Sequence, residues 1–413
     1  MLPEESEKVN IIENLARKIF KRYGYSEIRL PVLENQAIFI RGLGSNTEIV
    51  EKQIFKIEGK EGLCLRPEGT AQVVRAYIEH RLYFQRLVKL FYIGPMFRGE
   101  RPQRGRLRQF NHIGAEVLGI KSPFLDAETI SLADILLKNF GLGVKDYRLE
   151  INSLGCKNDQ DKLKNTLFSK IEPFKNSLCD DCKRRLYANV LRILDCKKDS
   201  CRNIVKSLNL NHSYLCNECR SYFDNVCKEL NSLNISYRIV PSLVRGLDYY
   251  TQTVFEFTAR GLLGSQNAVA AGGRYDNLVS ELSGPDKPAC GFAVGLDRIL
   301  LLLEDKPVKI NQPVFAAYTN EGVFEKAFQL IKLLREKGIP ADMDFEKKSL
   351  KSQLRYFQKL GAEFVIIVGE EELKKNVYPL KYMRSSEQKD LDIEGLIEEL
   401  TRNFNIRDNK PQL

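Results

Sequence analysis

The chain has 413 residues, of which 43% are hydrophobic and 29% are charged. This length exceeds one ordinary hydrophobic core and the composition argues against disorder, so two or three packed domains are expected. The formal net charge of +10 favours a polyanionic partner such as nucleic acid, although a basic surface that binds nothing would explain it equally well.

Targeting and redox signals indicate the cytoplasm. The first residues, MLPEESEKVN, are charged and include no apolar segment, and no apolar run reaches membrane-spanning length. The chain also has ten cysteines. Without a secretion signal, these indicate reduced thiols or a metal site rather than a disulfide framework. We therefore expect a cytoplasmic protein with no membrane contact.

The N-terminal part of the chain predicts an α+β domain. Apolar residues at helical spacing predict a helix over 4–23, and a strand is expected over 25–34, where Pro31 indicates an edge or a bulge. Short strands and turns follow over 63–118, with a helix expected over 71–80. This part has no Walker-type glycine-rich loop and no alternation of strands and helices, so its sheet should be mostly antiparallel.

Residues 155–235 are expected to form a helical insertion. Eight of the ten cysteines lie between Cys156 and Cys227, in a stretch dense in Lys, Asn and Asp. Strands resume after the insertion, and a helix is expected near 291–303. The first domain should therefore span residues 1–305.

The pattern changes in the C-terminal quarter of the chain. A polar segment with two prolines over 304–313 is a predicted linker. Beyond it, strands and amphipathic helices alternate: PVFAAYT and FVIIVG are predicted strands, and one helix is expected to end at Gly338. We expect a compact α/β domain over 313–413.

Four motifs occur in a fixed order in the first domain. They are RPEGT (66–70), FRGERPQRGRLRQFNHIGAE (97–116), RGLDYYTQTVFEF (245–257) and AGGRYDNL with GFAVGLDR (271–278 and 291–298). One short motif would be weak evidence. Together, on an antiparallel scaffold followed by an α/β domain, they resemble the bacterial histidyl-tRNA synthetases, a family of class II aminoacyl-tRNA synthetases. The resemblance covers nearly the whole chain.

The resemblance implies a fold, an activity and partners. The fold is a class II catalytic core on a mostly antiparallel sheet with a helical insertion, plus a C-terminal α/β domain that binds the anticodon. The activity is activation of L-histidine with ATP and Mg²⁺ to histidyl-adenylate and pyrophosphate, followed by transfer of histidine to the 3′ end of tRNA-His. The family also implies a homodimer, with the segment around Pro31 at the interface.

Arginines are expected to bind ATP. The first strand of the second motif ends in Arg98, whose guanidinium can clamp a phosphate with two hydrogen bonds. The resemblance adds Arg106, from the following loop, and Arg298, one turn into the helix after GFAVG. It also places Arg245 on the opposite side of the α-phosphate from Arg98, where both would stabilise the charge of an in-line displacement.

The imidazole of the substrate needs polar partners. A neutral imidazole has one N–H donor and one ring acceptor, so a specific pocket must present a partner on each side. The resemblance places these partners at Tyr250 and Glu116. Because adjacent strand residues face opposite ways, we expect Tyr250 in the pocket and Tyr249 closer to a packing role.

The ammonium group of the substrate is expected beside RPEGT. The resemblance places Glu68, Gly69 and Thr70 there, with His112 at a position where most relatives have glutamine. A histidine accepts a hydrogen bond from an ammonium only when it is neutral. We therefore expect the affinity for histidine to decrease as the pH falls below about 6.5, the reference pKa of imidazole. The decrease should be smaller in a His112→Gln variant.

Two cysteine pairs in the insertion have the spacing of a zinc ribbon. CDDC and CNEC together offer the thiols of Cys179, Cys182, Cys216 and Cys219. Cys196 and Cys201 are alternative ligands. The family does not generally require zinc, so free buried thiols explain the sequence as well as a structural Zn²⁺ does. No catalytic metal held by protein side chains is expected.

Two other functions fit part of the pattern. The regulatory subunit of ATP phosphoribosyltransferase resembles these synthetases but typically lacks the C-terminal domain and the complete histidine motifs. An RNA-binding module would show no ATP turnover.

The family usually begins with an arginine- and aspartate-containing segment, whereas Met1 lies almost at the first helix, so we expect a start that is truncated or assigned too late.

Overall fold

The chain divides into two compact units, Met1–Pro307 and Val308–Leu413. The computed structural model describes residues 1–44, 47, 49–260, 267–304 and 312–404. Most of the predicted linker over 304–313 therefore lies outside the described residues. Within the described ranges, no helix is both long enough and apolar enough to cross a membrane.

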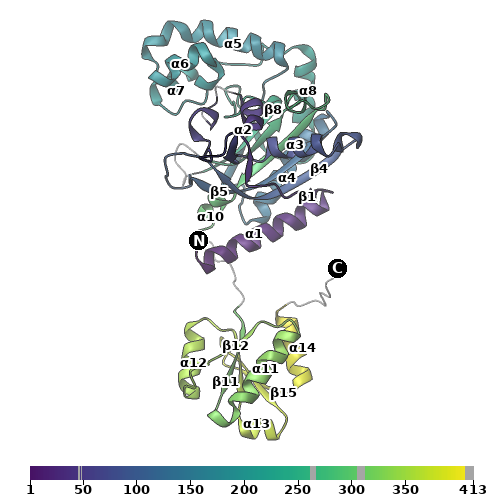
Figure 1. The fold of residues 1–413 in the computed structure, drawn as a ribbon, viewed down its shortest axis with the longest axis vertical. Coiled ribbons are helices and arrows are strands. Elements are labelled where there is room, and N and C mark those ends of the chain that lie inside the picture. The colour runs from purple at the N-terminus through teal and green to yellow at the C-terminus, as the bar shows by residue number, and fades with distance from the viewer. Residues whose placement is uncertain (45–46, 48, 261–266, 305–311, 405–413) are drawn as a thin grey trace. The chain divides into compact units, whose positions relative to one another are not determined.

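An eight-stranded sheet forms the centre of the first unit (Figure 1). Its order is β1-β4-β5-β10-β9-β8-β6-β7, and neighbours are antiparallel except in the pairs β1–β4 and β6–β7. The strands are β1 (Ser26–Glu27), β4 (Val88–Phe97), β5 (Gln109–Leu118), β6 (Tyr147–Ser153), β7 (Tyr237–Ile239), β8 (Thr251–Ala259), β9 (Ala268–Arg274) and β10 (Ala289–Gly295). The predicted antiparallel α+β fold is confirmed. β1 is a short edge strand that ends before Pro31.

Helices and a small separate sheet complete the core of this unit. The small sheet consists of β2 (Leu33–Asn35) and β3 (Leu63–Leu65). The helices are α1 (Pro3–Arg22), α2 (Gln36–Leu43), α3 (Thr70–Glu79), α4 (Pro123–Asn139), α9 (Leu278–Glu281) and α10 (Leu296–Leu302). The helix predicted over 291–303 begins only at Leu296, because residues 289–295 pair with both β5 and β9 as strand β10.

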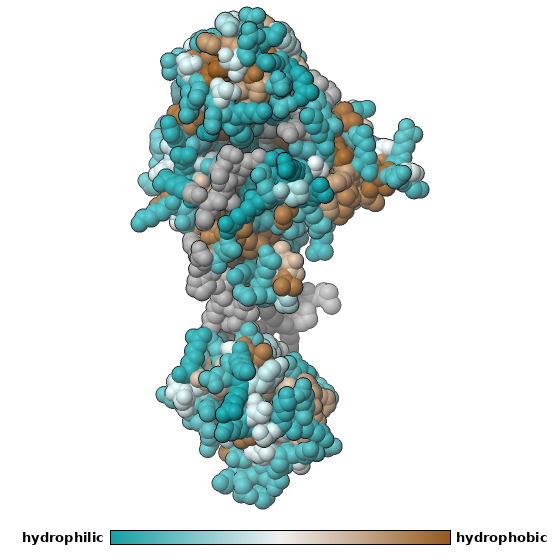
Figure 2. All heavy atoms as spheres, turned by 90° about the vertical axis from the view of Figure 1, so that its left-hand side faces the viewer, coloured by the Kyte–Doolittle hydropathy of each residue, from teal (hydrophilic) through white to brown (hydrophobic). Residues whose placement is uncertain are grey.

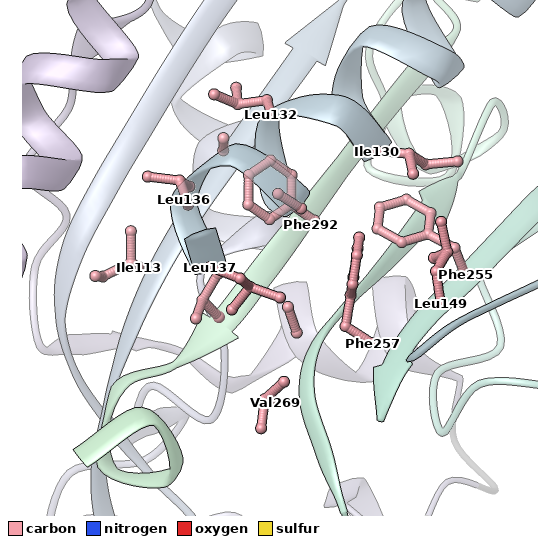
Figure 3. Packing of buried hydrophobic residues seen from close by; sticks show 14 of the residues in the cluster. Ile113, Ile130, Leu132, Leu136, Leu137, Leu149, Phe255, Phe257, Val269 and Phe292 are labelled. Carbon is pink, nitrogen blue, oxygen red and sulfur yellow. The ribbon is translucent and has the colours of Figure 1, made fainter. Parts of the chain in front are cut away.

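One face of the large sheet packs against α4. Figure 3 shows Leu132 of α4 near Phe292 of β10, within a core that also includes Ile113 of β5. Successive strand residues face opposite sides of a sheet. His112 and Glu116 of β5 therefore face away from this core, toward the side where the candidate site lies.

The insertion contributes helices between β6 and β7. They are α5 (Lys157–Ile171), α6 (Asp180–Ala188), α7 (Asp199–Ser207) and α8 (Asn217–Ser232). Figure 1 shows α5, α6 and α7 gathered at the end of this unit opposite α1, where they enclose a small core of their own. α8 instead packs along α4, so the insertion is anchored to the main core at its second end.

The second unit is a five-stranded sheet with helices on both faces. The sheet order is β12-β11-β13-β14-β15, from β11 (Val314–Tyr318), β12 (Ala341–Met343), β13 (Phe364–Val368), β14 (Tyr378–Tyr382) and β15 (Gln388–Leu391). The helices are α11 (Phe324–Glu336), α12 (Leu350–Lys359), α13 (Glu370–Lys374) and α14 (Ile393–Asn403). Gly338 has the positive φ that ends the turn after α11. The predicted α/β pattern is confirmed, and Figure 2 shows a mainly hydrophilic face of this unit.

Candidate active site

A cavity of about 490 Å³ borders the large sheet on the side away from α4, a volume within the usual range of small-molecule sites. Nine predicted site residues line it: Glu68, Thr70, Arg98, Arg106, His112, Arg245, Tyr249, Tyr250 and Arg298. Glu116 is buried beside the cavity and is hydrogen-bonded to Thr70, and Gly69 caps α3. The structure therefore brings residues of all four motifs together.

Glu68 is held by the start of α3. Its carboxylate accepts hydrogen bonds from the backbone amides of Thr70 and of the following residue, at 2.6 and 2.9 Å. Amides at a helix start lack partners within the helix. Burial raises the pKa of Glu68, although these amides and Arg98 favour the ionised form. A Cβ at Gly69 would lie 2.4 Å from the ring of Tyr92, so this close packing requires glycine.

The carboxylate of Glu116 accepts hydrogen bonds from two hydroxyl groups. Thr70 Oγ1 donates to one carboxylate oxygen at 2.7 Å, and the Tyr275 hydroxyl donates to the other. Burial raises the pKa of Glu116 to about 8, and the nearby Glu68 adds to this, although both hydroxyls favour ionisation. A Cβ at Gly291 would lie 1.8 Å from the carboxylate, so glycine on β10 makes room for it. Burial therefore favours the protonated form of Glu116 more than that of an ordinary carboxyl group.

Both rings of the tyrosine pair border the cavity. Tyr249 and Tyr250 lie in the turn before β8, which begins at Thr251, so strand alternation does not apply to them. Their ring centroids are 4.7 Å apart, and Tyr249 meets Tyr275 edge-on at 5.5 Å. Tyr250 borders the cavity as predicted. Tyr249 packs against Tyr275 and also borders the cavity, so strand alternation does not separate the two residues.

Two arginines are anchored by backbone carbonyls. Arg98 Nε donates to Pro67 O at 2.9 Å, and its guanidinium carbon lies 5.1 Å from the ring centroid of Phe110. Arg298 Nε donates to Gly105 O at 3.0 Å. Burial lowers the pKa of each arginine to about 10. Both side chains therefore keep their charge at neutral pH and remain available for an anion.

Two further arginines contact carboxylates at the cavity. Arg106 contacts Glu100, and Arg245 contacts Glu256 of β8. Burial alone would lower the pKa of Arg245, but Glu256 raises it. Arg192, from the insertion, donates to the backbone oxygen of Arg245 at 3.0 Å. The insertion therefore supports the position of Arg245 directly.

His112 lies in a cationic environment. Its ring meets that of Phe110 edge-on at 4.9 Å. Burial lowers the pKa of His112 well below 6.5, and Arg98, Arg298 and Arg66 lower it further. The neighbouring carboxylates do not outweigh burial and the three arginines, so the imidazole stays neutral at physiological pH. The lowered pKa shifts the predicted loss of substrate affinity through protonation of His112 to a more acidic pH, and the loss itself stays a prediction.

Two residues of AGGRYDNL were missed as site residues. Tyr275 holds Glu116, as described above. Its neighbour Arg274 is fully buried and donates to one oxygen of Asp126 on α4 at 2.6 and 3.0 Å, and to Asp276 at 2.8 Å. In the sequence, the only indication of a role for these two residues was a charged residue beside a tyrosine at the end of a strand of small residues. The partnership with α4 has no signal in the local sequence, because 148 residues separate Arg274 from Asp126.

The four cysteines predicted as zinc ligands belong to two separate groups. CDDC lies at the start of α6, whereas CNEC lies at the start of α8. Among the described residues, the potential ligands form two sets: Cys179, Cys182, Cys196 and Cys201, and Cys156, Asp159, Cys216 and Cys219. Within each set all ligand atoms lie within 4.8 Å of one another. The predicted combination of ligands is therefore wrong, although its cysteines lie in potential metal sites.

Comparison with known proteins identifies the family. The family model "Histidyl-tRNA synthetase" matches residues 1–299, and the model "Anticodon binding domain" matches residues 307–403. The histidine–tRNA ligase of Thermodesulfovibrio yellowstonii is 46% identical over 398 residues, covering 95% of this chain and 94% of the relative. That of Halothermothrix orenii is 44% identical over 409 residues, covering 97% of each chain.

Comparison with a solved structure identifies the same family. The crystal structure of apo Staphylococcus aureus histidyl-tRNA synthetase matches with a TM-score of 0.76 and 34% identity, covering 97% of each chain. The chain therefore belongs to the histidyl-tRNA synthetase family of class II aminoacyl-tRNA ligases.

Proposed function

We propose that the cavity activates L-histidine with ATP to form histidyl-adenylate and pyrophosphate, and that the chain then transfers histidine to the 3′ end of tRNA-His. The observation that carries this proposal is the division of one cavity into two chemical parts. One part presents buried carboxyls and tyrosine hydroxyls, which suit a small amino acid. The other presents arginines, which suit phosphates.

In the first part, we propose that Glu68 and Thr70 hold the ammonium of histidine. The helix start keeps Glu68 in place before substrate arrives, so little ordering is needed on binding. Tyr250 and Glu116 would be the partners of the imidazole. Either of them, left buried without a partner, would disfavour an apolar analogue.

In the second part, we propose that Arg98 and Arg245 flank the α-phosphate while Arg298 and Arg106 bind the rest of ATP. The attacking carboxylate of histidine and the leaving pyrophosphate are both anionic, so fixed positive charge lowers the barrier. ATP would enter as its Mg²⁺ complex, with the ion neutralising the β- and γ-phosphates.

A direct test is histidine-dependent exchange of pyrophosphate into ATP. Exchange that requires histidine supports the proposal, because it reports reversible adenylate formation. Exchange that is absent, while ATP or RNA still binds, would favour a regulatory subunit or an RNA-binding module.

Proton release should accompany histidine binding near pH 7. The pKa of Glu116 is about 8 in the empty cavity, and a bound cation or N–H donor favours the ionised carboxylate. Binding should therefore lower this pKa and release up to about one proton per site. Calorimetry in buffers with different ionisation enthalpies measures this number, and it should fall toward zero in Glu116→Gln.

His112→Gln is the matched control for that measurement. It also introduces glutamine on the same face of β5, but His112 is neutral at this pH, so proton release should remain at the wild-type value. The substrate's own imidazole has a reference pKa of about 6.5, so measurements near pH 7.5 keep its contribution to proton release small. Equal proton release by wild type and Glu116→Gln would refute the assigned role of Glu116.

We further propose that the second unit binds the anticodon of tRNA-His and that the chain forms a homodimer. The match of residues 307–403 to an anticodon-binding domain supports the first point. For the second, the segment after Pro31 exposes the apolar side chains of Val32 and Leu33, and Ile40 of α2 is also exposed. Exposed apolar side chains of this kind suit an interface.

A further inference from the structure

The first cysteine group has the spacing of a metal site. Cys179 and Cys182 lie in the first turn of α6, Cys201 lies in α7, and Cys196 lies in the turn between these helices. The sulfur atoms of Cys179 and Cys196 are 3.9 Å apart. Thiolates placed tetrahedrally at about 2.3 Å from Zn²⁺ lie about 3.8 Å from one another. A disulfide requires about 2.0 Å, and all ten cysteines are free.

The surroundings of this group suit thiolates. The backbone amide of Cys179 donates to the sulfur of Cys201 at 3.4 Å, a contact of the kind that orients metal ligands. Basic residues directly follow three of the ligands in the sequence: Lys183, Lys197 and Arg202. Four thiolates around Zn²⁺ carry a net charge of −2. Each of these three cations also has a carboxylate beside it, from Asp180, Asp195 and Asp199 respectively. A set of four cysteines is a common structural zinc site.

The second group contains an unsatisfied buried carboxylate. Asp159 is completely buried, and its Oδ1 accepts a hydrogen bond from the backbone amide of Cys216 at 3.0 Å. Its Oδ2 is buried without a hydrogen-bond partner in the described structure. The thiols of Cys156, Cys216 and Cys219 surround this carboxylate, and Lys162 Nζ lies 4.0 Å from its Oδ1. A cation held by these thiols would give the buried Oδ2 a direct partner. Gln252 of β8 donates to the sulfur of Cys219 at 3.2 Å, so this group is also supported from outside.

We propose that the insertion binds two structural zinc ions, one in each group. The sites would hold opposite ends of the insertion against the catalytic cavity. Cys179 and Cys196 border the cavity, on the segment that carries Arg192 to Arg245. The second site joins the starts of α5 and α8 to β8, whose first residues follow Tyr250.

Elemental analysis of the full-length chain, purified without chelators, is the first test. We expect about two zinc ions per chain. Cys201→Ser should reduce the content to one, and Cys219→Ser should remove the other. Cys227→Ser is the matched control, because Cys227 also lies on α8 but outside both groups, and it should retain both ions.

Each alternative outcome has a definite meaning. Folded, active and metal-free wild-type protein would overturn the proposal. One zinc ion that only one of the two variants loses would overturn the site that the other variant probes, and iron in place of zinc would overturn the identity of the ion.

If a serine variant does not fold, Co²⁺ substitution of the wild-type chain still tests whether the cysteine groups bind metal. Thiolate-to-cobalt charge-transfer bands with tetrahedral d–d bands are expected, and their absence would overturn the proposal.

Discussion

Replacement of Arg245 by alanine should lower histidine-dependent ATP–pyrophosphate exchange about 10²–10³-fold, corresponding to about 2.7–4 kcal/mol of transition-state stabilisation. The side chain of Arg245 borders the cavity and its guanidinium contacts Glu256, while Arg192 donates to the backbone oxygen of Arg245. It would therefore act on the phosphate without first having to become ordered. Histidine binding should stay measurable by calorimetry, because the proposed contacts of the amino acid lie elsewhere.

The control must separate loss of Arg245 from exposure of its partner. Arg245→Ala alone leaves the carboxylate of Glu256 without its ion pair in a largely buried position, which is itself unfavourable. The double variant Arg245→Ala with Glu256→Gln removes both charges. If the slow exchange persists in the double variant, the defect belongs to Arg245. Recovery of exchange, or near-wild-type exchange in the single variant, would remove Arg245 from the proposed mechanism.

Deletion of the second unit after Pro307 should reduce charging of tRNA-His by at least about 10²-fold while adenylate formation changes little. A loss of about 2.8 kcal/mol of tRNA binding energy is enough for this reduction in kcat/KM. Each unit has its own hydrophobic core, so the first unit should fold without the second. Aminoacylation and pyrophosphate exchange, measured in parallel on the full chain and the deletion protein, show how much more the first activity falls than the second.

Sedimentation equilibrium of the full chain and of the deletion protein is the control for this experiment. Both should be dimers if the segment after Pro31 forms the interface. An equal fall in the two activities would mean that the second unit is needed for folding or assembly rather than for tRNA. Monomers of an active full-length chain would contradict the proposed homodimer.

Local patterns in the sequence predicted the elements well. Helical spacing of Val9, Ile12, Ala16 and Ile19 corresponds to the buried face of α1. The proline-containing segment gave a short edge strand, and the linker marked a change from an antiparallel to an α/β pattern. These features depend on residues within one or two turns of each other, so a single sequence contains the information.

Contacts between distant segments could not be predicted in the same way. The ligand sets in the insertion depend on how α5 to α8 pack, so equal CxxC spacing suggested the wrong partners. Tyr249 was assigned by strand alternation, although β8 begins two residues later. The charge state of His112 depends on its burial and on three arginines from other segments. In each case the deciding neighbour is fixed by tertiary packing rather than by local spacing.

The buried position of Arg274 has a consequence for how the pocket is acquired during folding. Docking β9 without α4 would bury a guanidinium that lacks Asp126, which is strongly unfavourable. Partly docked intermediates are therefore poorly populated, and β9 and α4 should join the core together. Tyr275 follows Arg274 directly in the sequence. The hydroxyl that donates to Glu116 should therefore become positioned in the same folding step. A nascent chain should gain histidine binding only after β10 has also left the ribosome, because β10 lies between β5 and β9 in the sheet, although α4 is synthesised long before.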